Sequence, residues 1–202
     1  MNRSAIALLL LGLCAPLPAS TIFNQTSSSQ GVLSSTSAAF GFNLASTWNN
    51  VVITWEVASN NPPATVAAYL TTQIGLGTDA SHNVVPSAIV NAPGAINILT
   101  LFSGLTLGPG NYYVSIQTSN ALTGPLGGGT ATDTLGLGVT SLGTFTLTGG
   151  APAGTPVAAV SGMRFNVSGD PAEAVPEPST WVLNSLGFVV IGTIYRKRRR
   201  NA

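Results

Sequence analysis

A set of short apolar segments separated by glycine and proline turns constrains the fold of this chain most. Residues 51–57 read Val-Val-Ile-Thr-Trp-Glu-Val, so the apolar side chains at 51, 53, 55 and 57 face one side while Thr54 and Glu56 face the other. Similar patterns predict six further strands: Ala38–Leu44, Thr65–Thr72, Ile96–Phe102, Tyr112–Thr118, Leu142–Thr148 and Met163–Ser168. Turns punctuate them at Asn60–Pro63, Gly75–Asp79, Gly108–Gly110, Gly127–Gly129 and Gly149–Gly154. Because no long amphipathic helix interrupts this series, residues 21–169 are expected to form one all-β domain, a β-sandwich of jelly-roll or Ig-like type.

The composition says how such a domain is held together. Only 6% of the residues are charged, while 45% are hydrophobic, which excludes the composition of a disordered chain. The one cysteine, Cys14, lies close to the N-terminus. Residues 21–169 therefore contain no disulfide, thiol nucleophile or cysteine metal ligand, and their stability must come from an apolar core.

The charges are distributed unevenly along the chain. Five of the seven basic residues lie together at the C-terminus, at positions 196–200. Between Thr21 and Val175 one basic residue, Arg164, stands against five acidic ones, so this region has a net charge of −4 with His82 neutral. An acidic body does not attract phosphate backbones, which argues against nucleic-acid binding.

Residues 1–20 have the three parts of a secretory signal peptide. Arg3 supplies the positive charge, and the apolar helix expected over Ala5–Leu13 is too short to span a bilayer. The small residues of Leu17–Ser20 suit signal peptidase, with cleavage after Ala19 or Ser20. A buried N-terminal strand is the alternative interpretation.

The other end of the chain combines a rigid linker with a short apolar segment. The linker, residues 170–180, contains Pro-Glu-Pro-Ser-Thr, whose prolines disfavour both helix and sheet. Residues 181–200 hold an apolar run of 15 residues from Trp181 to Tyr195 and then a basic tail. As a helix this run is about 22 Å long, less than the hydrocarbon core of about 30 Å, so we expect a marginal transmembrane helix. The basic tail should stop translocation and stay on the cytoplasmic side.

This C-terminal arrangement resembles that of bacterial PEP-CTERM proteins, which exosortase enzymes sort. The resemblance covers about the last 27 residues, and Asn184 and Ser185 depart from the usual apolar span. It implies a sorting motif of Pro176, Glu177, Pro178, Ser179 and Thr180, and a membrane stop of Arg196, Lys197, Arg198, Arg199 and Arg200. It also implies a Gram-negative host that makes exopolysaccharide, a precursor in the inner membrane, and a mature protein at the cell surface or outside the cell.

The body offers few residues for catalysis. His82 is the only histidine, and Ser81-His82-Asn83 is expected to be a solvated loop rather than part of a catalytic triad. The carboxylates are scattered, so no acid/base pair for glycoside hydrolysis can be assigned. We therefore expect no catalytic residue and no cofactor.

Two weak metal ligands and one candidate for ligand binding remain. Asp79 and Asp133 are predicted to lie in loops, where they could bind calcium, although solvated loop acids are the more ordinary interpretation. Trp48 precedes Asn49-Asn50 at an expected turn, which makes it the best candidate for an exposed ring that stacks on a sugar, although ordinary packing is the favoured interpretation. Trp55 is expected in the core.

These observations predict an exported, non-enzymatic surface protein with a structural or adhesive role, associated with exopolysaccharide. Its partners would be signal peptidase and exosortase as processing enzymes, the membrane, and the polysaccharide. The alternatives are a secreted carbohydrate-active or other hydrolase, which two carboxylates facing a cleft would favour, and a carbohydrate-binding module.

Overall fold

The computed structural model describes residues 19–27, 31–32, 37–57, 64–92, 97–118, 123–124, 131–158 and 163–172. The described strands belong to a compact unit that ends at Asp170, and of the second unit, Pro171–Ala202, only the first two residues are described. The predicted signal-peptide helix, the sorting motif, the transmembrane helix and the basic tail lie outside these residues. Among the residues that are described, no helix has the length and apolar character needed to cross a membrane.

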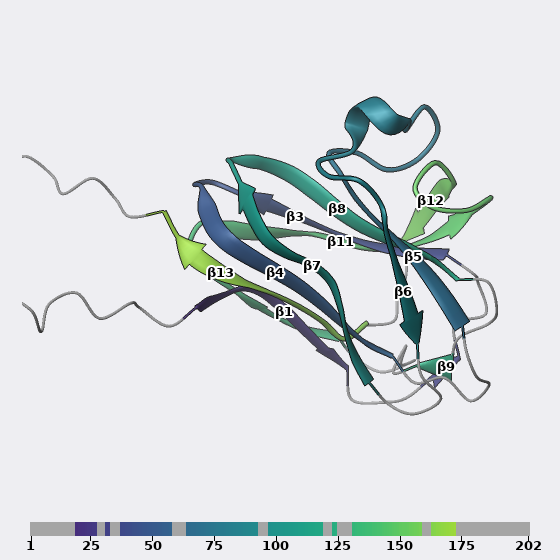
Figure 1. Cartoon of the computed structure of the whole chain (residues 1–202), viewed down its shortest axis with the longest axis horizontal. Helices are drawn as coiled ribbons and strands as arrows, with labels where there is room; N and C mark the ends of the chain where they lie inside the picture. Colours follow the sequence, from purple (N-terminus) through teal and green to yellow (C-terminus); the bar gives the residue numbers. More distant parts are fainter. Residues whose placement is uncertain are drawn as a thin grey trace, which may run out of the picture. The chain divides into compact units, whose positions relative to one another are not determined.

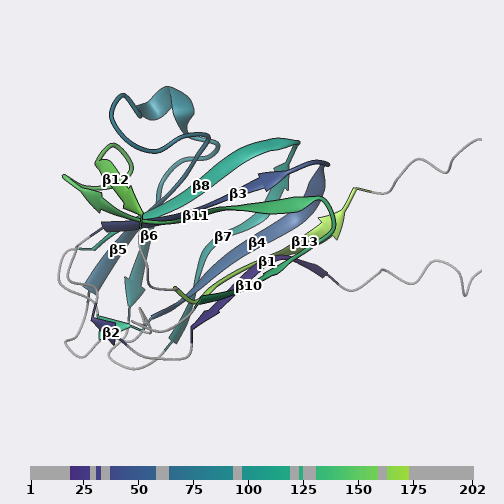
Figure 2. The same ribbon diagram turned by 180° about the vertical axis from the view of Figure 1, so that it is seen from behind.

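The described residues form two main antiparallel sheets that pack face to face (Figures 1 and 2). The first sheet has the strand order β10 (Ala131–Leu135), β1 (Ser20–Ser27), β13 (Phe165–Pro171), β4 (Trp48–Val57) and β7 (Asn97–Leu107). The second has the order β12 (Thr155–Ala158), β11 (Val139–Thr148), β3 (Ser37–Leu44), β8 (Gly110–Thr118), β5 (Ala64–Thr71) and β6 (Ala88–Ala92). Two short strands, β2 (Gly31–Val32) and β9 (Thr123–Gly124), pair with each other, and a 3₁₀ turn, η1 (Ala80–His82), follows β5. The prediction of an all-β sandwich is confirmed.

Aromatic rings from both sheets meet in the core. Phe165 of β13 lies with its ring centroid 3.9 Å from that of Phe40 of β3 and 5.7 Å from that of Trp55 of β4. Phe23 of β1 stacks on Phe40 and Phe42, at 5.6 Å and 6.4 Å. All five side chains are at most 1% exposed. Burying a side chain of this size contributes about 1.5–3 kcal/mol, so this cluster supplies the stability that the body cannot draw from disulfides.

The seven predicted strands are all present, and the predicted alternation is correct over residues 51–56. Val51, Ile53 and Trp55 are buried, whereas Thr54 and Glu56 are half-exposed on the outer face. The sequence interpretation missed β1, β6, β10, β12 and the two short strands β2 and β9. Of these, β6, β10 and β12 are edge strands, and their short sequences show little apolar alternation.

The boundaries of the body differ slightly from those expected. Asp170, which the sequence places in the linker, lies in β13, and its carboxylate accepts a hydrogen bond from the Asn50 amide at 2.8 Å. Ser20, placed in the signal peptide, begins β1 and pairs with Gly169. The strands thus run to the limits of the predicted domain and slightly beyond them.

A proline-glycine turn carries the chain from one sheet to the other. The sequence predicts a strand, a turn at Gly108–Gly110 and a second strand, and these are β7 and β8, which belong to different sheets. The Tyr112 hydroxyl donates a hydrogen bond to the carbonyl oxygen of Gly108 at 2.9 Å. Burial raises the pKa of Tyr112, so its hydroxyl stays protonated and remains a donor at neutral pH. This bond ties the crossing to the start of β8.

We expect Tyr112→Phe to destabilise the protein by about 1 kcal/mol, because it removes one partly buried hydrogen bond and leaves the Gly108 carbonyl without its partner. The measurement is the free energy of unfolding from urea denaturation. Tyr113→Phe is the matched control, since no hydrogen bond of the Tyr113 hydroxyl occurs within the described residues. Equal stabilities of the two variants would show that the bond does not hold the crossing.

Candidate functional site

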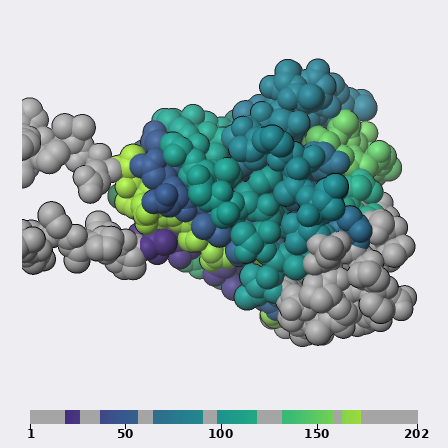
Figure 3. All heavy atoms as spheres, in the orientation of Figure 1, coloured from purple at the N-terminus to yellow at the C-terminus, as the bar shows by residue number. Residues whose placement is uncertain are grey.

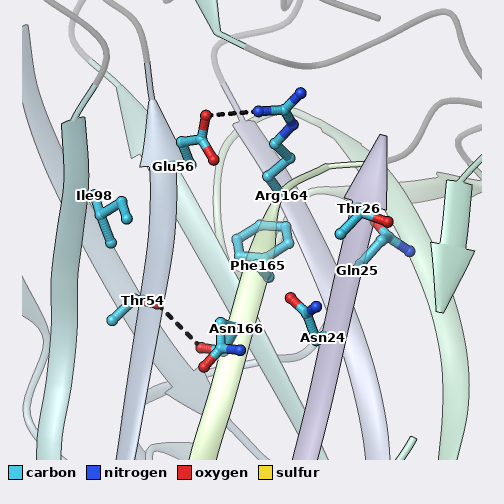
Figure 4. A pocket seen from close by; sticks show the side chains of 9 residues that line it. All are labelled: Asn24, Gln25, Thr26, Thr54, Glu56, Ile98, Arg164, Phe165 and Asn166. Carbon is cyan, nitrogen blue, oxygen red and sulfur yellow. Dashed lines mark hydrogen bonds and ion pairs between the residues drawn. The ribbon is translucent and has the colours of Figure 1, made fainter. Parts of the chain in front are cut away.

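A polar groove lies on the outer face of the first sheet (Figure 4). It has a volume of about 520 Å³, and strands β1, β13, β4 and β7 supply its walls. Its lining residues are Asn24, Gln25, Thr26, Thr54, Glu56, Ile98, Arg164, Phe165 and Asn166. The groove forms on this face because strand side chains alternate, so the apolar ones enter the core and leave amides, hydroxyls and charges outside.

An ion pair stands at one end of the groove. Nη1 of Arg164 lies 2.7 Å from Oε1 of Glu56, and the two side chains are 32% and 25% exposed. The backbone N–H of Glu56 also donates to the Arg164 carbonyl oxygen at 2.9 Å, so the two residues are held side by side across β4 and β13. Since the two charges neutralise each other, the groove presents no net charge to a ligand.

Amide side chains occupy the middle of the groove. Asn24 of β1 and Asn166 of β13 are direct cross-strand partners. Within the described residues neither side-chain amide has a hydrogen bond, so each can donate to and accept from a ligand. The Thr54 hydroxyl lies beside them and donates to the backbone carbonyl oxygen of Asn166 at 3.4 Å. Ile98 adds an apolar contact on β7, with 70% of its surface exposed.

Gln25 is a buried side chain in the lining of the groove. Its side chain is only 3% exposed, its Nε2 donates to Oδ1 of Asp133 at 2.7 Å, and its Oε1 accepts from the backbone N–H of Met163 at 2.7 Å. It therefore links β1, β10 and the segment that leads into β13. Sequence reasoning missed Gln25, Asn24 and Asn166 because neutral amides carry no motif, and their partners are more than a hundred residues away.

The groove lacks the parts of a hydrolytic site. Glu56 is the only carboxylate in its lining, and it is already paired with Arg164. Glycoside hydrolysis of the usual kind needs two carboxylates across the scissile bond. Among the described residues no group of three or more His, Cys, Asp and Glu side chains could hold a metal ion. What this arrangement can do is form hydrogen bonds with a neutral, polar ligand.

The two aspartates named as weak calcium ligands lie on different elements. Asp133 was expected in a loop, but it lies in β10, because this polar segment pairs along β1 with Gln25 opposite Asp133. Asp79 does lie in a turn, before η1, where it caps the backbone. In Figure 3 the segment between β5 and β6 stands out from the surface beside the β11–β12 hairpin. Each aspartate has a local structural partner.

Asp79, Ser81 and His82 form a local cluster whose geometry does not suit a catalytic triad. Oδ1 of Asp79 accepts from the backbone N–H of Ser81 at 2.9 Å and from the Ser81 hydroxyl. Nδ1 of His82 lies 3.1 Å from Oδ1 of Asp79 and 3.5 Å from the Ser81 hydroxyl. In a triad the serine and the acid contact opposite nitrogens of the ring, whereas both contact Nδ1 here. The cluster is a capping box on an exposed turn.

Trp48 is buried, so it is not available as an exposed ring that stacks on a sugar. Its side chain is 4% exposed and belongs to the core. The register of β4 with β7 shifts between Trp48 and Val51, and Asn50 has a positive φ of 51°. This bulge turns both Trp48 and Val51 inward, where strict alternation would place only Val51. The favoured interpretation of Trp48 as a packing residue is therefore correct, and so is the core position of Trp55.

The half-exposed aromatic rings lie on the outer face of the second sheet instead. Tyr113 of β8 lies opposite Gly41 of β3, and a Cβ atom at Gly41 would lie 2.7 Å from the Tyr113 ring. Only glycine allows this ring to lie flat against the sheet. Tyr113 also contacts Phe145 of β11, with ring centroids 6.4 Å apart. These rings support the sheet and take no part in the groove.

The capping cluster makes a pH-dependent contribution to stability. The Ser81 hydroxyl, followed by the Ser81 backbone N–H, holds the pKa of Asp79 below its ordinary value of 3.8. A carboxyl group whose pKa is lowered in the folded state stabilises the fold above its unfolded pKa, and this contribution is lost as the pH falls through the folded pKa. We expect Ser81→Ala to raise the Asp79 pKa in a carboxyl NMR titration. Ser87→Ala, an exposed serine in the same segment, should leave it unchanged, and an equal shift in both variants would contradict the assignment.

The described residues thus supply one neutral, hydrogen-bonding groove and one structural capping cluster. The sorting motif at Pro176–Thr180 and the basic residues at 196–200 lie outside the described part of the chain. No protein-family model matches this chain, and no curated protein is significantly similar to it.

Proposed function

We propose that this chain is an exported, non-enzymatic surface protein of the PEP-CTERM type, with a structural or adhesive role in an extracellular polysaccharide. The observation that carries the proposal is the order of features at the C-terminus: Pro-Glu-Pro-Ser-Thr, a short apolar run and a cluster of basic residues. In this proposal signal peptidase removes the leader, and the tail then holds the precursor in the inner membrane until exosortase processes it.

The tail is better suited to temporary than to permanent anchoring. Its apolar run is about a quarter shorter than the hydrocarbon core when helical, so it would hold the chain only moderately well. The prolines on both sides of Glu177 keep the adjacent backbone extended, which is the form that a protease binds. The basic residues at 196–200 would stall the chain with Glu177 at the outer surface of the membrane.

We further propose that the sandwich is Ig-like rather than a jelly roll. The Tyr112 hydroxyl bonds to a backbone carbonyl four residues upstream, directly after a crossing between the sheets, as in the tyrosine corner of Ig-like domains. The sequential strands β4, β5, β6, β7 and β8 are also divided between the sheets as strands B, C, C′, E and F are: β4 and β7 are neighbours in the first sheet, and β8, β5 and β6 are neighbours in the second.

The groove supports a role in binding a neutral polysaccharide. Asn24, Asn166 and Thr54 offer the amides and hydroxyls that pair with sugar hydroxyls. The ion pair of Glu56 with Arg164 leaves the groove without net charge. The exposed Ile98 could contact the apolar face of a sugar ring at its edge. The alternative of a hydrolase is less favoured because only one carboxylate lines this groove.

The sorting proposal predicts that Glu177→Ala blocks removal of the tail while leaving membrane insertion intact. The measurement is the length of the C-terminus in surface and membrane fractions of the native host, by mass spectrometry. Glu173→Ala is the matched control, an acid in the same linker but outside the motif, and it should be processed normally. If the wild-type protein at the surface retains its tail through Ala202, the segment is a plain anchor and the proposal is wrong.

The binding proposal predicts that a double variant, Asn24→Ala with Asn166→Ala, binds the exopolysaccharide of the host about tenfold more weakly, because it removes two hydrogen-bonding amides. Isothermal titration calorimetry of the mature protein measures this. Asn43 and Asn111, a cross-strand pair on the other sheet with an amide contact of 2.7 Å, provide the matched control when both are changed to Ala. Equal affinity of both double variants would exclude the groove as the binding site.

A further inference from the structure

Leu137 is the most exposed large apolar side chain among the described residues. It is 94% exposed and stands between two glycines, Gly136 and Gly138, in the turn that joins β10 to β11. Leu135, two residues earlier, is 41% exposed. Gly138 has a positive φ of 71°, a conformation that favours glycine, so the turn is built to hold Leu137 away from the body.

Backbone hydrogen bonds fix this turn at the end of the sandwich that contains the start of β1 and the end of β13. The N–H of Gly136 donates to the Ile22 carbonyl oxygen of β1 at 2.8 Å. On the other side of β1, Ser20 pairs with Gly169 of β13. The turn is thus two strand spacings, or about 10 Å, from β13 across the sheet, level with the last residues of that strand. Figure 2 shows β10, β1 and β13 side by side.

The chain that follows β13 connects this end to the predicted membrane segment. Nine residues, 172–180, separate Pro171 from the apolar run that starts at Trp181. Fully extended, they span about 30 Å at most. The charged group at this end, Asp170, accepts a hydrogen bond from the Asn50 amide. The β3–β4 turn beside Leu137 is uncharged, and its Ala45 N–H donates to the Gly138 carbonyl oxygen at 2.9 Å.

We propose that Leu137, supported by Leu135, inserts into the interface of the lipid bilayer while the tail anchors the precursor. This inference rests on the proposed membrane insertion of the tail. A leucine side chain alone binds a membrane only marginally. The short tether makes its insertion intramolecular and raises its effective concentration. The contact would orient the sandwich on the membrane, and it would weaken once cleavage removes the tether.

A fluorescent probe next to Leu137 tests this contact. The chain from Ser20 to Ala202 lacks Cys14, so Ala45→Cys introduces a single labelling site, exposed and in contact with the turn. The labelled protein is reconstituted into phosphatidylcholine vesicles that carry a quencher attached to the lipid. We expect the lipid to quench the probe, and Leu137→Ser to reduce this quenching several-fold.

Leu76→Ser is the matched control. Leu76 is also a leucine between two glycines and is 86% exposed, but the N–H of its neighbour Gly75 donates to Pro152 of the β11–β12 turn, away from the chain ends. This variant should leave the quenching unchanged. If the tail is inserted and the two substitutions change the quenching equally, or neither changes it, the inference is overturned.

Flotation of the vesicles separates the two proposals. A chain that floats with the vesicles but has an unquenched probe retains the tail proposal and overturns the Leu137 contact. A chain that does not float contradicts membrane insertion of the tail, and the inference falls with it. A blue shift of the probe without lipid quenching would show that protein, such as a second copy, covers Leu137, and this also overturns lipid contact.

Discussion

The structure depends on the stacking of aromatic rings between its two sheets. Phe165 of the first sheet contacts both Phe40 of the second sheet and Trp55 of its own sheet, and all three are at most 1% exposed. A domain without cysteine cannot replace this contact by a covalent one. The rings therefore set both the distance between the sheets and the face that each strand turns inward. Every outward position on β1, β13, β4 and β7 follows from that choice.

The groove is a consequence of this packing. Because Phe165 and Trp55 point inward, their neighbours Arg164, Asn166, Thr54 and Glu56 point outward, on adjacent strands. The ion pair between Glu56 and Arg164 and the amides of Asn24 and Asn166 thus lie on a rigid sheet instead of on loops. Such a surface needs little reorganisation to bind an extended ligand.

The departures from regular alternation shape the ends of the sandwich. The bulge at Asn50 brings Trp48 into the core, although the sequence near it reads as an exposed turn. The crossing at Gly108–Gly110 looks like a hairpin in sequence, yet its two strands belong to opposite sheets, and Tyr112 secures it. The Gly-Leu-Gly turn after β10 likewise crosses between sheets and leaves Leu137 exposed. Each of these three features lies where the chain departs from regular strand conformation.

The sequence by itself determined the all-β class, seven of the strands and the buried face of residues 51–55, because alternation and turn residues are local properties of the chain. It also contains the terminal segments from which export and sorting are proposed. Only the tertiary structure decided which strands are neighbours, that Trp48 is buried and that a groove exists. The reason is the separation of the partners in sequence: Glu56 and Arg164 are 108 positions apart, and so are Gln25 and Asp133. No local pattern encodes such pairings, since they arise only when the aromatic core brings β1, β4, β10 and β13 into one sheet.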